Sequence, residues 1–269
     1  MSVFTITFCD RGENHVGNQQ IGKLADFGFT FDELVEISAT LNKYGILCEL
    51  HNLRDLLPEQ ERKDVKNAGF LIIRNGLDKI TNSLGADKKL FNELSGLEFD
   101  KHAKMYGRVV QKHARHNLVF ADFDQAADYE SGKGTILNFN RLPLCGWIRQ
   151  ILPYLSNNLE TKNKLTNLVA ELNHYYDIKK CYIGYHSDLE RKIVVGLRVG
   201  EAYPLHFQWY LNSQKIGAKL DILLNSGDLY IMDEKACGFD GRQKKIPVLR
   251  HAAGFDEVLE KTKKKEKKE

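Results

Sequence analysis

The chain has 269 residues, 42% of them hydrophobic and 28% charged, and its formal net charge is +3. No stretch approaches the roughly 20 consecutive apolar residues that a membrane-spanning helix needs. The N-terminus alternates like a β-strand and does not resemble a secretory signal. This pattern excludes a membrane protein, and we expect a soluble, intracellular protein of the cytoplasm or nucleus with no membrane partner.

The cysteines and the terminal lysines lead to two further expectations. The five cysteines are scattered and include no C-x-x-C pair, so we expect reduced, structural thiols. From Lys261 onward the tail holds six lysines and two glutamates, so residues 1–260 carry a net charge of −1. We expect residues 259–269 to be a disordered, Lys-rich tail, with a tether to phosphates or a nuclear signal as the alternative.

The first 100 residues predict an N-terminal α/β extension of unknown role. The segment from Thr30 has a capping pattern followed by apolar residues at helical spacing, so we expect a helix that ends at Gly45. Strands are expected at residues 3–8, 46–50 and 70–74, and a loop with a short helix at residues 14–25. Gly, Asn, Asp and Lys accumulate at residues 80–100, where we place a domain boundary.

Residues 101–258 are expected to form a second, larger domain. It begins with a basic strip, residues 101–116, and continues with helices at residues 144–155 and 162–172. Closely spaced strands follow at residues 182–186, 192–199, 205–211, 220–224, 229–231 and 248–251. Helices followed by many short strands predict an α+β fold with a double-stranded β-helix, or jelly-roll, core and flanking helices.

Three residues of this second domain have the pattern of a metal site. His186 and Asp188 form an H-x-D pair at one expected strand, and His251 lies on a later strand. Two imidazoles and one carboxylate on a single face can hold Fe(II) and leave three coordination positions open. We therefore predict that His186, Asp188 and His251 are the metal ligands and form the catalytic centre.

Several motifs around this site resemble those of the AlkB-like dioxygenases. Asn173-His174-Tyr175 is similar to the N-x-Y block of that family, and His186 to Glu190 is similar to its H-x-D-x-E/D block. Gly227-Asp228-Leu229 resembles the strand that precedes the distal histidine. The resemblance covers about residues 105–255.

The resemblance implies an oxidoreductase that uses Fe(II), 2-oxoglutarate and O2. Such an enzyme decarboxylates 2-oxoglutarate to succinate and oxidatively demethylates or hydroxylates a nucleic-acid base, in DNA or RNA. The resemblance also implies that Asn173 and Tyr175 form hydrogen bonds with the co-substrate.

The chain departs from the family where the far carboxylate of 2-oxoglutarate is bound. AlkB-like proteins place arginines after the distal histidine, whereas no arginine follows His251 here. Burying that carboxylate without a partner would be very costly. Alternation puts Gly196 and Arg198 on one strand face, which the resemblance makes the cofactor-facing side, so we expect Gly196 to leave room and Arg198 to bind the carboxylate. Arg250 is the second choice and a lysine of the tail is the third.

The basic strip lies where AlkB-like proteins carry their nucleotide-recognition segment. It contains lysines, arginines and histidines and no acidic residue. Its basic side chains could hold phosphates while an aromatic side chain stacks on a base, although a solvated face is the alternative. We assign substrate binding to residues of the strip and of the H-x-D block, namely Tyr106, Arg108, Lys112, Arg115, Tyr185 and Glu190.

Three other functions are compatible with these patterns. The first is a protein side-chain hydroxylase with the same chemistry. The small net charge of residues 1–260 supports this alternative. The second is a catalytically inactive binding module that has lost co-substrate binding. A zinc hydrolase with the same three ligands is the third, and it lacks an obvious general base beside the site.

Overall fold

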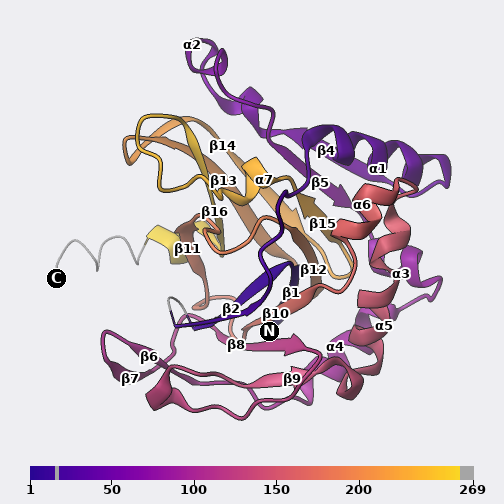
Figure 1. The fold of residues 1–269 in the computed structure, drawn as a ribbon, viewed down its shortest axis with the longest axis vertical. Helices are drawn as coiled ribbons and strands as arrows, with labels where there is room; N and C mark the ends of the chain where they lie inside the picture. Colours follow the sequence, from indigo (N-terminus) through magenta and orange to yellow (C-terminus); the bar gives the residue numbers. More distant parts are fainter. Residues whose placement is uncertain (16–17, 261–269) are drawn as a thin grey trace.

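The computed structural model describes residues 1–15 and 18–260, and most of its regular structure is β-strand. The described residues form an eight-stranded sheet, a four-stranded sheet and two separate hairpins, with most of the α-helices at one side (Figure 1). The Lys-rich tail from residue 261 lies outside the described residues.

The eight-stranded sheet has the order β4-β5-β15-β12-β1-β10-β8-β9. Its neighbours are antiparallel except for β8 and β9, which are parallel. Its strands are β1 (Val3–Cys9), β4 (Cys48–Asn52), β5 (Gly69–Ile73), β8 (His116–Ala121), β9 (Ile136–Asn138), β10 (Val169–Tyr175), β12 (Val194–Gly200) and β15 (Leu229–Met232).

The four-stranded sheet has the order β11-β16-β13-β14 and is antiparallel. Its strands are β11 (Ile183–His186), β13 (Tyr203–Leu211), β14 (Gln214–Leu224) and β16 (Val248–Ala253). The two hairpins consist of β2 (Arg11–His15) with β3 (Gln19–Gly22), and of β6 (His102–Met105) with β7 (Arg108–Gln111).

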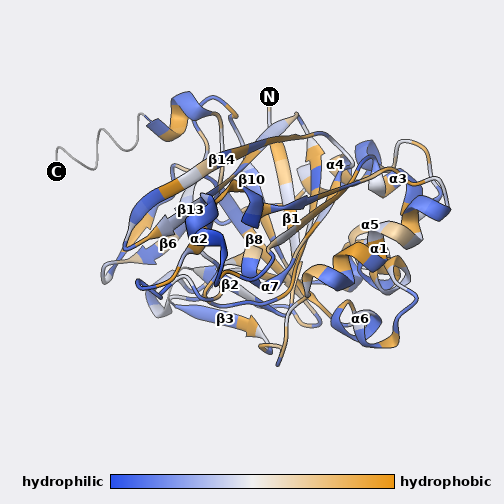
Figure 2. Cartoon of the chain, turned by 90° about the horizontal axis from the view of Figure 1, so that it is seen from above, coloured by the Kyte–Doolittle hydropathy of each residue, from blue (hydrophilic) through white to orange (hydrophobic). Residues whose placement is uncertain are grey.

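The α-helices are α1 (Phe31–Lys43), α2 (Glu59–Arg62), α3 (Gly76–Thr81), α4 (Ala86–Ser95), α5 (Pro143–Ile151), α6 (Leu159–Lys164) and α7 (Glu234–Cys237). Short 3-10 helices are η1 (Leu53–Leu56), η2 (Tyr129–Ser131), η3 (Phe139–Arg141) and η4 (Leu152–Leu155). Figure 2 shows α1, α3, α5 and α6 together on one side of the molecule, with β6 and β13 toward the other. None of the described helices combines the length and the hydropathy required to span a bilayer.

The first strand lies in the middle of the eight-stranded sheet. β1 pairs with β10 on one edge and with β12 on the other, and β4 and β5 extend the same sheet beyond β15. Backbone hydrogen bonds therefore cross the boundary that the sequence suggests near residue 100, and residues 1–100 supply three strands of a sheet shared with residues 101–258.

Two apolar cores lie on opposite faces of this sheet. Phe4 and Ile6 of β1 belong to the core that α1, α4 and α5 cover, whereas Val3 belongs to a core shared with the four-stranded sheet. Phe207 and Trp209 of β13 are fully buried in that second core. A buried side chain of this size contributes about 1.5–3 kcal/mol, so both layers are held to the sheet mainly by apolar contacts.

The capping pattern at Thr30 is confirmed. The Thr30 hydroxyl accepts a hydrogen bond from the backbone N–H of Glu33, and the Glu33 carboxylate accepts one from the backbone N–H of Thr30. Glu33 also forms an ion pair with Lys164 at the end of α6, with 2.8 Å between Lys164 Nζ and Glu33 Oε2. This pair joins two helices that lie far apart in the sequence.

Three expected segments have a different structure. Residues 14–25 contain the end of β2 and all of β3 in place of a short helix. Residues 162–172 contain the end of α6 and the start of β10, because Ala170 and Leu172 alternate into the helix-side core while Glu171 faces the cavity. The boundary region near residues 80–100 contains α4, whose residues Leu90 and Leu94 are fully buried.

The Gly227-Asp228 motif forms the turn between β14 of the four-stranded sheet and β15 of the eight-stranded sheet. Gly227 has φ +85°, a left-handed conformation that favours glycine. Asp228 is buried, and its carboxylate accepts hydrogen bonds from the backbone N–H groups of Asn75 and Asn225, both at 2.9 Å. Arg74 Nη1 donates to the same carboxylate at 2.7 Å. Asp228 therefore stabilises the entry to β15, two strands from β1.

We expect Asp228→Ala to lower the free energy of unfolding by about 2–4 kcal/mol, because it removes a buried carboxylate that accepts two backbone hydrogen bonds and pairs with a partly buried guanidinium. Asp124→Ala is the matched control, since Asp124 pairs with Arg141 where both side chains are exposed. Urea denaturation would compare the two variants with the wild type. Equal midpoints for all three would contradict a stabilising role for Asp228.

Candidate metal centre

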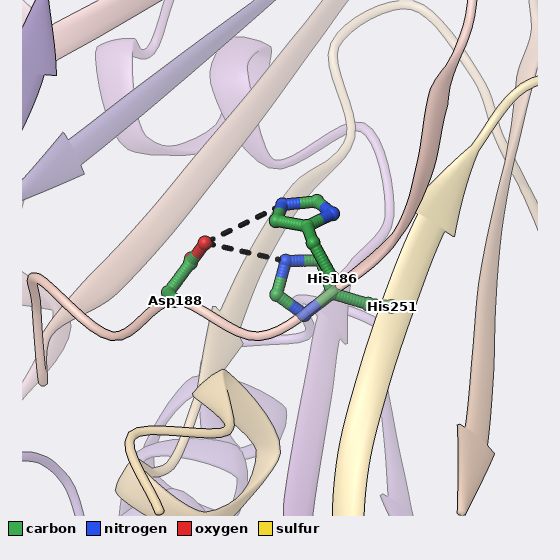
Figure 3. A group of neighbouring side chains, drawn as sticks. All are labelled: His186, Asp188 and His251. Atoms are coloured by element: carbon green, nitrogen blue, oxygen red, sulfur yellow. Dashed lines mark ion pairs between the residues drawn. The ribbon is translucent and has the colours of Figure 1, made fainter. Parts of the chain in front are cut away.

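The three expected ligands meet at the end of the four-stranded sheet. His186 on β11 and His251 on β16 are direct partners in the antiparallel register, so both rings lie on the same face. Asp188 follows two residues after β11. Its Oδ1 lies 3.4 Å from His186 Nε2 and 3.6 Å from His251 Nε2 (Figure 3). One ligand atom from each residue therefore faces a common point, and these atoms lie within 4.8 Å of one another.

Hydrogen bonds fix the orientation of His186 and the position of the loop that carries Asp188. His186 Nδ1 lies 2.8 Å from the carbonyl oxygen of Gly184. A carbonyl only accepts, so Nδ1 carries the proton and the Nε2 lone pair is left to bind a metal. The backbone N–H of Asp188 donates to the carbonyl of Cys237, which positions the loop after β11.

The environment keeps Asp188 ionised and His251 neutral. Burial raises the pKa of Asp188, but Arg191 and His251 lower it further, so the pKa lies well below its usual range. Burial, together with the neighbouring His186, lowers the pKa of His251. An ionised carboxylate and a neutral imidazole are the forms that bind a divalent metal.

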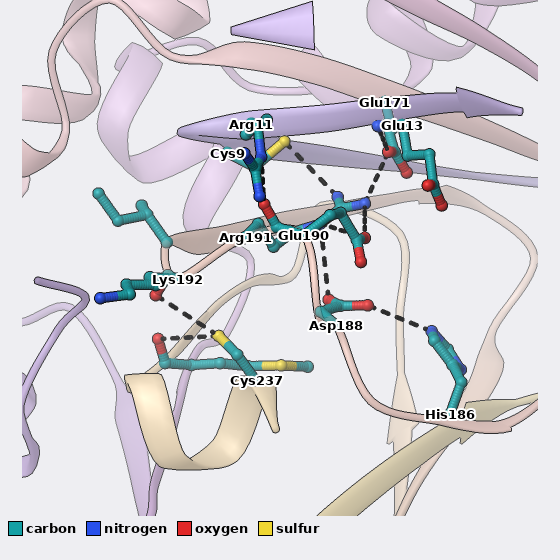
Figure 4. Close-up of polar contacts among 12 residues, drawn as sticks. Cys9, Arg11, Glu13, Glu171, His186, Asp188, Glu190, Arg191, Lys192 and Cys237 are labelled. Carbon is teal, nitrogen blue, oxygen red and sulfur yellow. Dashed lines mark hydrogen bonds and ion pairs between the residues drawn. The ribbon is translucent and has the colours of Figure 1, made fainter. Parts of the chain in front are cut away.

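A buried ion-pair network borders the group of His186, Asp188 and His251 on one side (Figure 4). Arg191 is buried, and its Nη2 lies 2.6 Å from Glu171 Oε1 and 2.5 Å from Glu190 Oε1. Its Nε lies 3.8 Å from Asp188 Oδ2, the oxygen that does not face the histidines. Burial raises the pKa of Glu190 although Arg191 opposes the shift. Arg191 thus neutralises the acidic side of the site.

A cavity of about 940 Å³ opens at the cluster. Strands of both sheets line it, including β1 and β10 of the large sheet and β11 and β16 of the small one. Ten of the predicted site residues line this cavity: Tyr106, Arg115, Asn173, Tyr175, Tyr185, His186, Asp188, Glu190, Arg198 and His251. Four others, Arg108, Lys112, Gly196 and Arg250, are not among its lining residues.

Arg198 lines the cavity, and no carboxylate of the described residues pairs with it. It lies on β12 with 1% of its surface exposed. Its Nη1 donates to the hydroxyl of Thr5, and its guanidinium lies over the ring of Tyr203 at 5.3 Å. Among residues 1–15 and 18–260, Arg198 Nε has no hydrogen-bond partner and no ion pair neutralises the group. An unpaired buried cation is costly, so this guanidinium is a candidate binding group for an anionic ligand.

The other residues predicted around Arg198 have different roles. The ring of Tyr230 fills the space over Gly196, where an added Cβ would lie 1.8 Å from the ring, so the room that Gly196 leaves accommodates a side chain of β15. Arg250 lies against the ring of Tyr210 at 4.4 Å, away from the cavity.

Asn173 and Tyr175, to which the resemblance assigns hydrogen bonds with the co-substrate, both line the cavity from β10. The Asn173 side-chain oxygen accepts a hydrogen bond from Arg115 Nε at 2.7 Å. Tyr175 is buried, and its ring packs against Tyr203 with centroids 4.7 Å apart. Both side chains therefore lie on the cavity face of the large sheet, between β1 and β8.

The basic strip forms the β6–β7 hairpin and the segment that leads into β8. Tyr106 is at the hairpin tip, 95% exposed, at the cavity mouth. Arg108 is exposed outside the cavity. Lys112 instead turns inward and donates to Asn117, and burial lowers its pKa to about 8. The strip is thus an exposed hairpin followed by a segment whose Lys112 side chain points inward.

Several cavity residues were missed by the sequence analysis. Thr5 and Thr7 of β1 and Glu13 of β2 come from the N-terminal segment, and Arg242 comes from the loop before β16. No motif marks them, since each reaches the site through long-range strand pairing or a loop. The place of Arg191 at the site could have been predicted, because this arginine directly follows the H-x-D-x-E block.

No protein-family model matches the chain. The chain is 45% identical over 255 residues to the "Uncharacterized protein R156" of Acanthamoeba polyphaga mimivirus, and the alignment covers 95% of this chain and 96% of the viral protein. The chain therefore belongs to the same family as this viral protein. Because so little of the chain is left unaligned, the similarity includes most of residues 1–100, in line with their place in the large sheet.

Proposed function

We propose that the protein is an Fe(II)- and 2-oxoglutarate-dependent dioxygenase with a double-stranded β-helix core. The observation that supports this most is a single cavity that contains both the His186, Asp188 and His251 cluster and Arg198. One end can bind a metal, and the other presents a buried guanidinium that no carboxylate of the described residues neutralises. A dicarboxylate co-substrate bound to the metal would satisfy both ends.

The donor set suits iron. His186, Asp188 and His251 would hold the metal through two imidazole nitrogens and one carboxylate oxygen, a set that favours Fe(II) and leaves coordination positions open. Cys9 and Cys237 near the site are fully buried, and burial raises the pKa of both thiols, so they stay protonated. Bound Fe(II) would supply the oxidising chemistry by activating O2 at the open positions.

The chain's own residues would bind and orient the co-substrate. Arg198 would hold the far carboxylate of 2-oxoglutarate through its planar fork. Asn173 and Tyr175 line the same cavity from β10 and offer an amide and a phenol as hydrogen-bonding groups. Because Arg198 and Tyr175 are buried, this end of the cavity is shielded from bulk water.

The exposed end of the cavity supports a nucleic-acid substrate. Tyr106 stands at the mouth on a hairpin that carries Lys101 and Arg108 on its exposed surface, and Tyr185 lines the same opening. An exposed ring beside basic side chains can stack on a base while the cations contact phosphates. The proposed reaction is therefore oxidation of a base, with a protein side chain as the alternative substrate.

The test is succinate release by the full-length protein loaded with Fe(II) and supplied with 2-oxoglutarate and O2. We expect slow turnover without any further substrate, and faster turnover when an accepted substrate is added. The same protein with Zn(II) is the control, because zinc is redox-inactive. If 2-oxoglutarate binds but neither condition releases succinate, the chain is a binding module; if 2-oxoglutarate does not bind, the proposal fails.

We expect Lys101→Glu together with Arg108→Glu to weaken oligonucleotide binding and to reduce the log–log salt slope by about two units, since each phosphate contact contributes close to one. Lys63→Glu with Lys66→Glu is the matched control, because both lysines are exposed near α2, at the opposite end of the molecule from β6 and β7 (Figure 1). Fluorescence anisotropy at several salt concentrations would measure both. If the wild type shows no salt-sensitive binding, a protein substrate is favoured.

A further inference from the structure

We propose that Thr5, on the N-terminal strand, is a second binding residue for the far carboxylate of the co-substrate and acts together with Arg198. This inference rests on the proposed function and assigns a ligand contact to the first strand of the chain. It is supported by the position of Thr5, by its hydrogen bond with Arg198 and by the hydroxyl proton of Thr5, which that hydrogen bond does not use.

Strand pairing brings Thr5 to the cavity. β1 and β12 are antiparallel neighbours, and Thr5 is the direct register partner of Arg198. Neighbouring β1 residues Phe4 and Ile6 point into the helix-side core, so alternation turns Thr5 to the opposite face. Thr5 is 5% exposed and lines the cavity together with Arg198.

The hydroxyl of Thr5 has one hydrogen-bonding position left to fill. Its oxygen accepts a hydrogen bond from Arg198 Nη1. A hydroxyl that accepts still has its own proton to donate. Among the residues that the structure describes, no acceptor for that proton is found, and Arg198 Nε is also without a partner. Thr5 and Arg198 both line the cavity, so the hydroxyl and the guanidinium beside it can together donate to the two oxygens of one carboxylate.

The geometry also explains why the hydroxyl matters to Arg198. The guanidinium is fixed by the Thr5 oxygen at Nη1 and by the ring of Tyr203 at 5.3 Å. A guanidinium held in place before the ligand binds loses less side-chain entropy on binding. Thr5 would therefore strengthen carboxylate binding both by donating its proton and by positioning Arg198.

The test measures affinity for 2-oxoglutarate and for 2-oxobutyrate, which lacks the far carboxylate, with the full-length Mn(II)-loaded protein under anaerobic conditions. Thr5→Val keeps the side-chain shape and removes the hydroxyl. We expect it to weaken 2-oxoglutarate binding about tenfold or more, as for loss of a hydrogen bond to a charged group, and to leave 2-oxobutyrate binding unchanged. Thr5→Ser should retain most of the affinity.

Thr7→Val is the matched control. Thr7 lies two residues along the same face of β1, and its hydroxyl is hydrogen-bonded to Tyr230. It should leave the preference for 2-oxoglutarate over 2-oxobutyrate unchanged. Equal loss of both ligands in Thr5→Val, or an unchanged preference, would overturn the assignment of Thr5. If wild-type protein binds neither ligand, the proposed function fails instead.

Discussion

Asp188→Ala should weaken Mn(II) binding by more than about 100-fold, because even the residues that only orient metal ligands are worth 10- to 100-fold. An oxygen of the Asp188 carboxylate faces both imidazoles, at 3.4 Å and 3.6 Å from their Nε2 atoms. Two neutral imidazoles would then have to hold a divalent cation without a negative charge in the cluster. Succinate release should be lost together with metal binding.

A second variant separates loss of the ligand from loss of the fold. Asp188→Asn keeps the shape of the side chain and its backbone hydrogen bond to Cys237, and Arg191 keeps its pairs with Glu171 and Glu190. We expect it to fold and still to bind Mn(II) poorly. The measurement is a Mn(II) titration followed by electron paramagnetic resonance. Wild-type affinity in both variants would show that the metal binds elsewhere.

The stability of the fold and the binding of a metal should both depend on pH in a defined direction. The pKa of Asp188 is held well below its usual range in the folded protein, so its ionised form stabilises the fold above the unfolded pKa of a carboxylate. This contribution is lost as the pH falls through the folded pKa. Protonation of His251, whose pKa is lowered, would oppose metal binding first on acidification, before Asp188 is protonated.

The local parts of the site could be predicted, because the residues that carry them lie close together in the sequence. The H-x-D spacing puts His186 and Asp188 side by side, and alternation along β12 puts Arg198 on the cavity face. The same alternation places Gly196 on that face, but what fills the space over a glycine depends on a different strand. Tyr230 of β15 fills it, and no pattern around Gly196 indicates that.

The long-range parts could not be predicted. β1 pairs with β10 and β12, which begin more than 160 residues later in the chain, and the alternation of Val3 to Cys9 shows a strand without showing its partners. The apolar pattern of residues 162–172 predicts one helix. Pairing with β1 and β8 instead makes its second half a strand, whose polar residues face the cavity.

Arg198→Met should weaken 2-oxoglutarate binding by about 2–5 kcal/mol, the usual cost of removing one partner from a buried, charge-assisted pair. Methionine keeps much of the side-chain volume, so the core between the sheets stays filled. Mn(II) affinity should be nearly unchanged, since Arg198 is not one of the three residues that could hold a metal. Arg198→Lys should restore only part of the affinity, because an ammonium cannot reproduce the planar fork.

Arg250→Ala is the control for this prediction, because Arg250 lies against Tyr210 and does not line the cavity. Calorimetric titration of 2-oxoglutarate into the Mn(II)-loaded proteins would give the affinities.

A thermal melt adds an independent readout. The ligand should raise the melting temperature of the wild type and of Arg250→Ala but not that of Arg198→Met. Without ligand, Arg198→Met should be at least as stable as the wild type, because it removes a buried cation for which the described residues provide no anion. A large loss of affinity in Arg250→Ala with none in Arg198→Met would show that Arg250, and not Arg198, binds the far carboxylate.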